Sequence, residues 1–342
     1  MKICAVILVF MANFALAAKP EVRPAARPAA EPGGPGFCIF GAQSGKLLDS
    51  EAAYKTVVWK NDVVYVGETH DELLDHQAQL ETLRSMRIAR GSRIAVGFEM
   101  LDQTVQPALD DYLAGKLPEP EFLARADWKK EGGFDFALYK PLFDFIAANK
   151  LKALALNVPR TVVKKIARSG LAGLTPEERK LLPERLDITV HKKYNEYLKR
   201  SFEEHGGTPE VKTFTLENYA ASMAAWNEAM GARLAEFLGA NPGYAALVVA
   251  GNGHIIYNAA IPASVKARVK GVRQASFYTE SAAHCPETFP KAHKDMANYI
   301  WYINHPPKPA TAAPAAAGSP AVSAAAVSTA VPAALPPSSE KK

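Results

Sequence analysis

Polar residues follow four short apolar stretches, at the points where predicted β-strands end. The stretches are residues 63–66, 94–98, 151–156 and 245–250. In an open α/β sheet, ligands bind outside the carboxyl ends of the strands. If the four strands are parallel, one rim of the sheet carries the polar residues that follow them, which are Glu68, His70, Glu99, Asn157 and His254.

The apolar residues between these stretches recur at helical spacing. Helices are predicted over residues 71–89, 105–114, 120–126 and 139–149. Strands that alternate with helices are typical of βαβ units. The sequence therefore predicts an α/β fold with a mostly parallel sheet flanked by helices.

Two further segments differ from this alternation. Residues 161–240 contain helical patterns without a convincing strand, which predicts a helical cap or insertion beside the sheet. Residues 274–279 predict a strand at the edge of the sheet.

Both ends of the chain differ in composition from its middle. Lys2, an apolar stretch and the small-x-small sequence Ala15-Leu16-Ala17 predict a signal peptide over residues 1–17. This signal, which has no evident lipid-accepting cysteine, predicts a periplasmic or secreted protein. Residues 18–36 and the Pro/Ala-rich residues 306–342 are predicted to be disordered. We therefore expect one α/β domain over residues 37–305, with its cap at about 161–240.

Charge and cysteine content narrow the classes of function. The formal net charge of +5 comes from dispersed Lys and Arg residues, which disfavours nucleic acid as a partner. Cys38 and Cys285 remain after removal of the signal peptide, and an oxidising compartment would allow them to pair. Whether their Cα atoms approach closely enough is left open by the sequence.

Two histidines and two glutamates at the predicted rim are candidates for chemistry. Imidazole suits zinc, copper, iron or nickel, and a carboxylate can complete a ligand set or act as a general base. Glu68, His70, Glu99 and His254 could hold one divalent metal ion, or form a hydrogen-bonded cluster without one. In a hydrolase, Glu68 or Glu99 would be the catalytic base.

Two other residues could line the same site. His76 follows His70 on the predicted helix, at a spacing unlike that of a zinc-protease helix. Arg160 follows the third strand and could meet an anion such as a carboxylate or a propionate. The chain has no Gly-x-Ser-x-Gly, which excludes the nucleophile elbow of α/β hydrolases.

Seven short motifs follow one another within residues 40–270. They are Val-Gly-Glu-Thr-His-Asp (66–71), His76 with Gln79, Gly-Phe-Glu-Met (97–100), Tyr-Lys-Pro-Leu (139–142), Ala-Leu-Asn-Val-Pro-Arg (155–160), Trp-Asn-Glu-Ala-Met (226–230) and Ala-Gly-Asn-Gly-His (250–254). In this order and at these distances, they resemble the ChaN-like haem-binding proteins, within the wider Tiki and erythromycin-esterase superfamily.

The resemblance implies haem binding connected with iron acquisition, with an outer-membrane haem receptor system as a partner. In the protease and esterase branches it implies hydrolysis, metal-dependent in the Tiki proteases. A homodimer that sandwiches haem between the caps would also fit. Haem needs an axial ligand and an apolar pocket. The predicted cap offers candidate binding residues, which are Tyr194, Tyr197 and Tyr219. Asn227 departs from the family pattern, in which an acid is common at that position.

Overall fold

The computed structural model describes residues 38–131, 133–186, 191–204 and 214–304. The predicted signal peptide, linker and tail lie outside these residues. Within the described ranges, one sheet is formed by β1 (Ile39–Gly41), β2 (Val63–Glu68), β3 (Ile94–Asp102), β4 (Lys152–Asn157), β5 (Ala245–Gly251), β6 (Gln274–Ala282) and β7 (Tyr299–Asn304).

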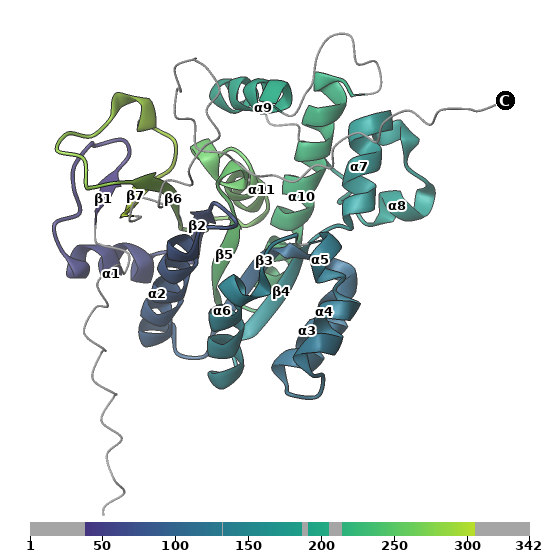
Figure 1. The fold of residues 1–342 in the computed structure, drawn as a ribbon, viewed down its shortest axis with the longest axis horizontal. Coiled ribbons are helices and arrows are strands. Elements are labelled where there is room, and N and C mark those ends of the chain that lie inside the picture. Colours follow the sequence, from purple (N-terminus) through teal and green to yellow (C-terminus); the bar gives the residue numbers. More distant parts are fainter. Residues whose placement is uncertain (1–37, 132, 187–190, 205–213, 305–342) are drawn as a thin grey trace, which may run out of the picture. The chain divides into compact units, whose positions relative to one another are not determined.

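Helices connect and cover these strands (Figure 1). The α-helices are α1 (Glu51–Lys60), α2 (Leu73–Arg90), α3 (Gln106–Leu113), α4 (Glu119–Arg125), α5 (Trp128–Glu131), α6 (Phe136–Ala148), α7 (Arg160–Ser169), α8 (Pro176–Lys180), α9 (Lys192–Glu204), α10 (Leu216–Ala240) and α11 (Ile261–Arg268). Short 3₁₀ turns are η1 (Gln103–Val105), η2 (Leu171–Gly173), η3 (Asn252–His254), η4 (Ile256–Asn258) and η5 (Lys291–His293).

The strand order is β1-β7-β6-β2-β5-β3-β4. Strand β1 runs antiparallel to β7, and the other neighbouring strands are parallel. This arrangement confirms the predicted α/β fold with a mostly parallel sheet. The four strands that end in polar motifs are β2, β5, β3 and β4, and they are consecutive in the sheet, so their carboxyl ends share one rim.

The core lies on both faces of the sheet. In β2, Val63 and Tyr65 join one apolar cluster, whereas Val64 and Val66 join the other. This alternation is the two-residue period of a strand, and burial of both faces is typical of parallel sheets. Helices α7, α9, α10 and α11 contribute to the first cluster, and α1, α2, α3, α4 and α6 contribute to the second.

The prediction of an edge strand over residues 274–279 was wrong. Strand β6 lies between β2 and β7, because residues 299–304 form a further parallel strand beside it. The sequence of β7, Tyr-Ile-Trp-Tyr-Ile-Asn, is rich in the aromatic and β-branched residues that favour strands. The sheet therefore extends past β6 to β7 and β1.

A side chain protects the opposite edge of the sheet. The Gln106 amide donates to the backbone carbonyl of Ala153 at 2.9 Å, and its Oε1 accepts from the backbone N–H of Ala155 at 2.8 Å. The Gln106 side chain therefore forms the hydrogen bonds with the backbone of β4 that a further strand would otherwise form. Such caps are one way in which an edge strand is kept from pairing with another chain.

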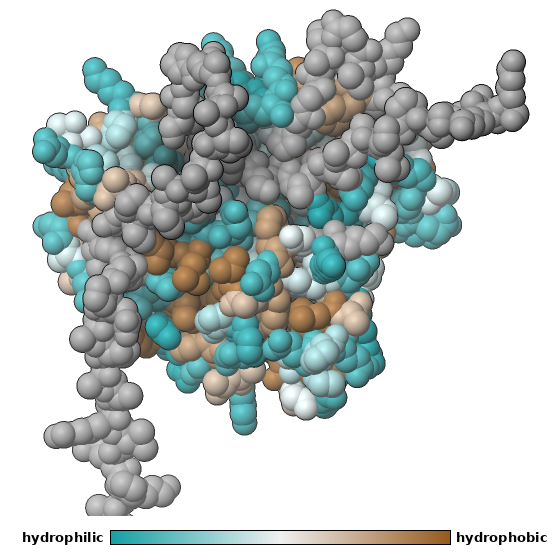
Figure 2. All heavy atoms as spheres, viewed as in Figure 1, coloured by the Kyte–Doolittle hydropathy of each residue, from teal (hydrophilic) through white to brown (hydrophobic). Residues whose placement is uncertain are grey.

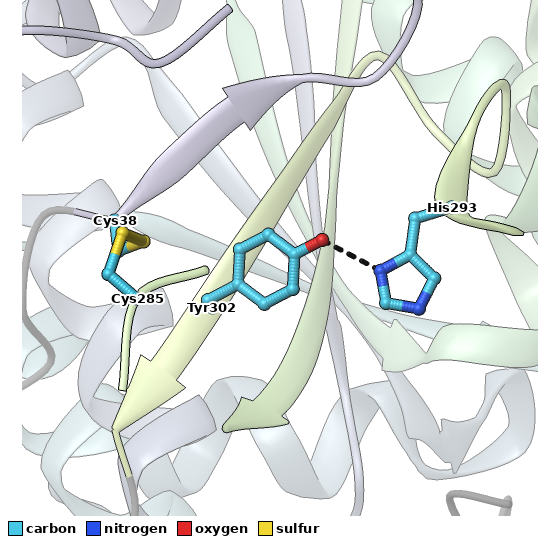
Figure 3. The surroundings of a disulfide bond; sticks show 4 residues. All are labelled: Cys38, Cys285, His293 and Tyr302. Atoms are coloured by element: carbon cyan, nitrogen blue, oxygen red, sulfur yellow. Dashed lines mark hydrogen bonds between the residues drawn. A yellow bond between two sulfur atoms is a disulfide. The ribbon is translucent and has the colours of Figure 1, made fainter. Parts of the chain in front are cut away.

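A disulfide bond ties the β1 end of the sheet to the segment that follows β6. Cys38 and Cys285 are bonded with their Cα atoms 5.7 Å apart (Figure 3). In the same region, the hydroxyl of Tyr302 on β7 lies 2.7 Å from Nδ1 of His293, and its ring packs edge-on against Phe40. The segment between β6 and β7 is thus attached to the sheet by the disulfide bond of Cys285 and by the hydrogen bond of His293.

None of the helices in the described part of the chain is long and apolar enough to cross a membrane.

We expect the double substitution Cys38→Ser/Cys285→Ser to lower the free energy of unfolding by about 2–4 kcal/mol, because the bond closes a long loop in the unfolded chain. Urea denaturation of the mature protein measures the change. A reducing agent should reproduce it in the wild type and leave the double variant unaffected. Equal stability of the oxidised and reduced wild type would contradict this expectation.

Candidate functional site

The register of the central strands brings two carboxylates together. Glu68, the last residue of β2, pairs with Gly251 at the end of β5. The backbone N–H of Gly251 donates to Oε2 of Glu99 on β3 at 2.7 Å. Both glutamates and both histidines of the predicted rim site are buried, with His70 and Glu99 each 4% exposed. The structure therefore places Glu68, His70, Glu99 and His254 in one cluster.

Glu68 is held by donors on both carboxylate oxygens. Its Oε1 lies 2.7 Å from Nδ1 of His70 and accepts from the Tyr139 hydroxyl at 2.6 Å. Its Oε2 accepts from the Gln79 amide at 2.6 Å and lies 3.4 Å from Nδ1 of His76. Burial opposes the charged form, but His76 and His70 together hold the pKa of Glu68 below its usual value.

His70 is a buried partner of Glu68. Burial would lower the pKa of His70, but the hydrogen bond and charge of Glu68 raise it. The Phe134 ring stacks on the imidazole, with ring centroids 4.3 Å apart. Because Nδ1 faces Glu68, Nε2 is the ring nitrogen that faces the rest of the site.

His76 extends this cluster toward Gln79 on α2. Its Nε2 lies 3.1 Å from the carbonyl oxygen of His70, and its Nδ1 lies 3.2 Å from Oε1 of Gln79. The Gln79 amide nitrogen donates to Glu68, so Oε1 is the atom that faces His76. Both ring nitrogens of His76 thus face oxygen atoms of the cluster.

Glu99 and His254 form a second carboxylate–imidazole pair. Nε2 of His254 lies 3.1 Å from Oε1 of Glu99, outside ideal hydrogen-bond geometry. Nδ1 donates to Oδ1 of Asn227 at 2.6 Å, and the Asn227 amide donates to the Tyr194 hydroxyl at 2.8 Å. Burial would raise the pKa of Glu99, but the charge and contact of His254 lower it to about 2.

The two pairs meet at Gly251. A Cβ added there would lie 2.9 Å from Nε2 of His70 and 3.6 Å from Oε2 of Glu99. The first distance is shorter than a side-chain carbon tolerates, so only glycine fits at this position without displacing His70. Nε2 of His70 and Oε2 of Glu99 therefore both pack against Gly251.

These residues do not fit a divalent metal centre as they are arranged. Each carboxylate oxygen of Glu68 and Glu99 already faces a donor or an imidazole. In the described ranges, no group of three or more His, Cys, Asp or Glu residues is placed to hold a metal ion. In the structure, the four residues are joined by the hydrogen bonds and close contacts given above.

The other predicted residues have different surroundings. Asn157 donates to the backbone carbonyl of Glu99 at 2.8 Å and so positions β3. Arg160, the first residue of α7, places its guanidinium beside Gly133, next to Phe134. Tyr219 bonds Ser201 at 2.8 Å between α10 and α9. The Tyr197 hydroxyl lies close to Gly253, beside the η3 turn.

Sequence reasoning did not assign roles to Tyr139, Gln79 and Asn227, although all three lie within quoted motifs. Each sits on a helix, and each orients a glutamate or a histidine through one hydrogen bond. Their presence in the seven quoted motifs was the available signal. The search for polar residues that follow strands did not identify them, because these three residues lie on helices.

An apolar surface adjoins His70. Helices α2 and α6 pack together, and hydrophobic residues gather over this part of the face in Figure 2. Leu73, at the start of α2, is 50% exposed, and Leu80, Phe134 and Leu138 are half-buried. A ligand that reached Nε2 of His70 would thus meet apolar side chains beside it.

A third buried carboxyl group lies beside the cluster. Asp75 accepts from the backbone N–H of Thr69 at 2.7 Å and from the Thr279 hydroxyl at 3.0 Å. Burial raises the pKa of Asp75 from 3.8 to about 7, in spite of these hydrogen bonds. The folded protein therefore binds this proton more tightly than the unfolded chain does.

A raised carboxyl pKa stabilises the fold below the unfolded pKa, and this stability is lost as pH rises through the folded pKa. In the wild type, the free energy of unfolding should therefore fall by about 2–4 kcal/mol between about pH 4 and about pH 8. Asp75→Asn should abolish this fall. Denaturant titrations across this range measure the difference between wild type and variant. Glu196→Gln, which alters an exposed carboxylate on α9, should keep the wild-type slope, and an Asp75→Asn profile parallel to the wild type would refute the assignment.

Comparisons found several solved structures similar to this chain, and the first of them supports the fold. A solved structure of ChaN of Campylobacter jejuni, described by its cofacial haem binding, has 17% sequence identity and a TM-score of 0.59, over 77% of this chain and 94% of that one. The type III effector HopBA1 has 14% identity and a TM-score of 0.41, over 73% and 91%. A mutant of the erythromycin esterase EreC in its open conformation has 13% identity and a TM-score of 0.38, over 71% and 77%.

None of the curated proteins matches the chain. The family model for haem-binding uptake proteins of the Tiki superfamily, ChaN, matches residues 56–265. This range spans more than half of the chain and includes Glu68, His70, Glu99 and His254. The protein therefore belongs to the ChaN family of haem-binding uptake proteins within the Tiki superfamily.

Proposed function

We propose that this protein binds haem in the periplasm or outside the cell and serves haem or iron uptake. Family membership supports haem as the ligand, and the apparent signal sequence supports export. An outer-membrane haem receptor system is the proposed partner. A homodimer is the proposed assembly, by analogy with the cofacial haem binding described for the Campylobacter jejuni protein.

Among the residues of this chain, the geometry of His70 is the observation that best supports haem binding. Haem iron takes an axial histidine, and a ligating histidine usually donates its other ring nitrogen to a carboxylate or a carbonyl. Nδ1 of His70 lies 2.7 Å from Glu68, so the ring is oriented and Nε2 is the nitrogen left for iron. His254 is unsuited to this role, because it is fully buried and its Nε2 faces Glu99.

The surroundings of His70 also suit a flat, mostly apolar ligand with acidic groups. Phe134 provides apolar contact with the imidazole, and Leu73, three residues after His70, adds exposed apolar surface at the start of α2. Arg160 lies near Gly133, where its guanidinium would meet a propionate. Because His70 is 4% exposed and its Nε2 lies on the side of Gly251, we expect both the Phe134 ring and the turn at Gly251 to move when the macrocycle reaches Nε2.

Haemin titration of the mature protein, followed by Soret absorption, tests this proposal. The wild type should give a saturable shift, and His70→Ala should weaken binding at least tenfold, which corresponds to about 1.4 kcal/mol or more. His293→Ala removes a histidine that bonds Tyr302, and should leave binding unchanged. A His70→Ala protein with the wild-type Soret spectrum and affinity would place the ligand elsewhere, with Tyr197 as the next residue to test.

A second candidate function rests on the Glu68–His70 pair. An imidazole oriented by a carboxylate can act as a general base, and His70 has Glu68 behind it, with Nε2 on the side of Gly251 and Glu99. The hydrolase alternative from the sequence invoked a metal ion. The arrangement of the donors instead favours a hydrolase in which Nε2 of His70 takes a proton from water.

Hydrolysis of a simple ester such as p-nitrophenyl acetate tests this second candidate. If it is correct, His70→Ala should lower kcat/KM by about 10²–10⁴-fold. Preincubation with a chelator should leave the rate unchanged, because the carboxylate oxygens are used by donors. A wild-type rate equal to that of the His70→Ala variant would exclude catalysis by this residue and leave haem binding as the function to pursue.

A further inference from the structure

A cleft between η4 and the segment that follows β1 forms a second candidate site, separate from the Glu/His cluster. Its volume is about 650 Å³, within the range of about 300–1,000 Å³ found for small-molecule sites. The turn between β1 and residue 46 forms one wall, and Tyr257, Asn258, Asp295 and residues 297–299 form the other. None of the residues that form the Glu/His cluster lines this cleft.

Backbone strain is concentrated at this cleft. In the described part of the chain, five residues other than glycine have positive φ, and three of them line the cleft, namely Tyr257 (58°), Asn258 (52°) and Asp295 (66°). Such conformations cost about 1–3 kcal/mol each and persist where the surrounding structure fixes them. Here the backbone N–H of Tyr257 donates to the carbonyl of Met296, which joins the two strained positions.

Two side-chain amides are oriented toward the cleft by a buried serine. The Ser276 hydroxyl lies 2.7 Å from Oδ1 of Asn258 and 3.1 Å from Oδ1 of Asn298. The backbone N–H of Ser276 also donates to Oδ1 of Asn298 at 3.0 Å, which fixes the amide orientation. Because both oxygens face Ser276, the amide nitrogens are the atoms that these residues present to a ligand.

The charges that line the cleft nearly cancel. Lys46 and Asp49 have opposite charge, and Asp295 lies 3.1 Å from Nζ of Lys193. A site for phosphate or a carboxylate would need an excess of positive charge and of donors. A neutral ligand is therefore favoured over an anion.

The mixture of polar groups indicates the chemistry of that ligand. Amide nitrogens donate and Asp49 accepts, while the Tyr257 ring, which lines the cleft between His191 at 5.7 Å and Nζ of Lys193 at 5.9 Å, supplies aromatic surface. Sugar hydroxyls both donate and accept hydrogen bonds, and the C–H groups of a sugar ring pack on aromatic side chains. We propose that this cleft binds a neutral saccharide through the amides of Asn258 and Asn298 and the Tyr257 ring.

The first test uses the mature protein and neutral saccharide probes, namely maltose, cellobiose and N,N′-diacetylchitobiose. Saturation-transfer NMR and calorimetry should show saturable binding of at least one of them. Asn298→Asp keeps the oxygen that accepts from Ser276 but replaces the amide donor with a negative charge, and should weaken binding at least tenfold. Ser92→Asp adds the same charge at an exposed position outside the cleft and should leave the affinity unchanged.

Two variants at position 257 separate the ring from the backbone. Tyr257→Gly tolerates positive φ but lacks the ring, and should abolish binding, whereas Tyr257→Phe should retain it. These variants keep the proposal testable if Asn298→Asp does not fold, and melting temperatures identify such a failure.

Three results would overturn the proposal. They are the absence of saturation by all three probes up to about 10 mM, equal affinity in wild type and Tyr257→Gly, and binding of inorganic phosphate in place of the saccharides. Since no haem is needed for these measurements, their outcome is independent of the proposed haem function.

Discussion

The parallel pairing of β5 with β2 and β3 is the constraint on which the site depends. In this register Glu68 lies beside Gly251, and the backbone N–H of Gly251 reaches Glu99. A shift of one residue would turn every side chain of a strand to the other face of the sheet. The apolar residues of β5 prevent such a shift, because Ala246 and Val248 pack on one face while Leu247 and Val249 pack on the other.

Buried carboxylates are tolerated at this rim because each is matched by cationic or donor groups. Glu68 has His70 and His76, and Glu99 has His254 and a backbone N–H. Removal of one partner from such a pair leaves a buried charge uncompensated, which costs about 3–5 kcal/mol. Asp75 lies nearby with hydroxyl and backbone donors, and its raised pKa favours the neutral form. The site is thus pre-organised by charge balance, so that Nε2 of His70 keeps its position without a bound ligand.

The sequence predicted the sheet and the rim well because both follow from local patterns. Apolar runs that end in Gly67-Glu68 or Gly251-Asn252 mark strand ends, and parallel strands bring such ends together. The position of β6 was wrong because strand order depends on β7, which pairs through contacts distant in sequence. Whether Glu68 and Glu99 bind a metal was also undetermined, since spacing does not show which atoms each carboxylate oxygen faces. Tyr139 supplies one of those atoms from α6, about seventy residues after Glu68.

One turn connects the rim site with the cleft. His254 ends η3 and points to Glu99, while Tyr257 and Asn258, which end η4, line the cleft. Two consecutive residues with positive φ reverse the chain over this short distance, and Ser276 and Met296 hold them in place. The same strained backbone therefore keeps His254 turned inward and the Asn258 amide turned outward. Relaxation of the turn would disturb both positions, so the strain at Tyr257 and Asn258 is maintained by structure that serves the rim as well as the cleft.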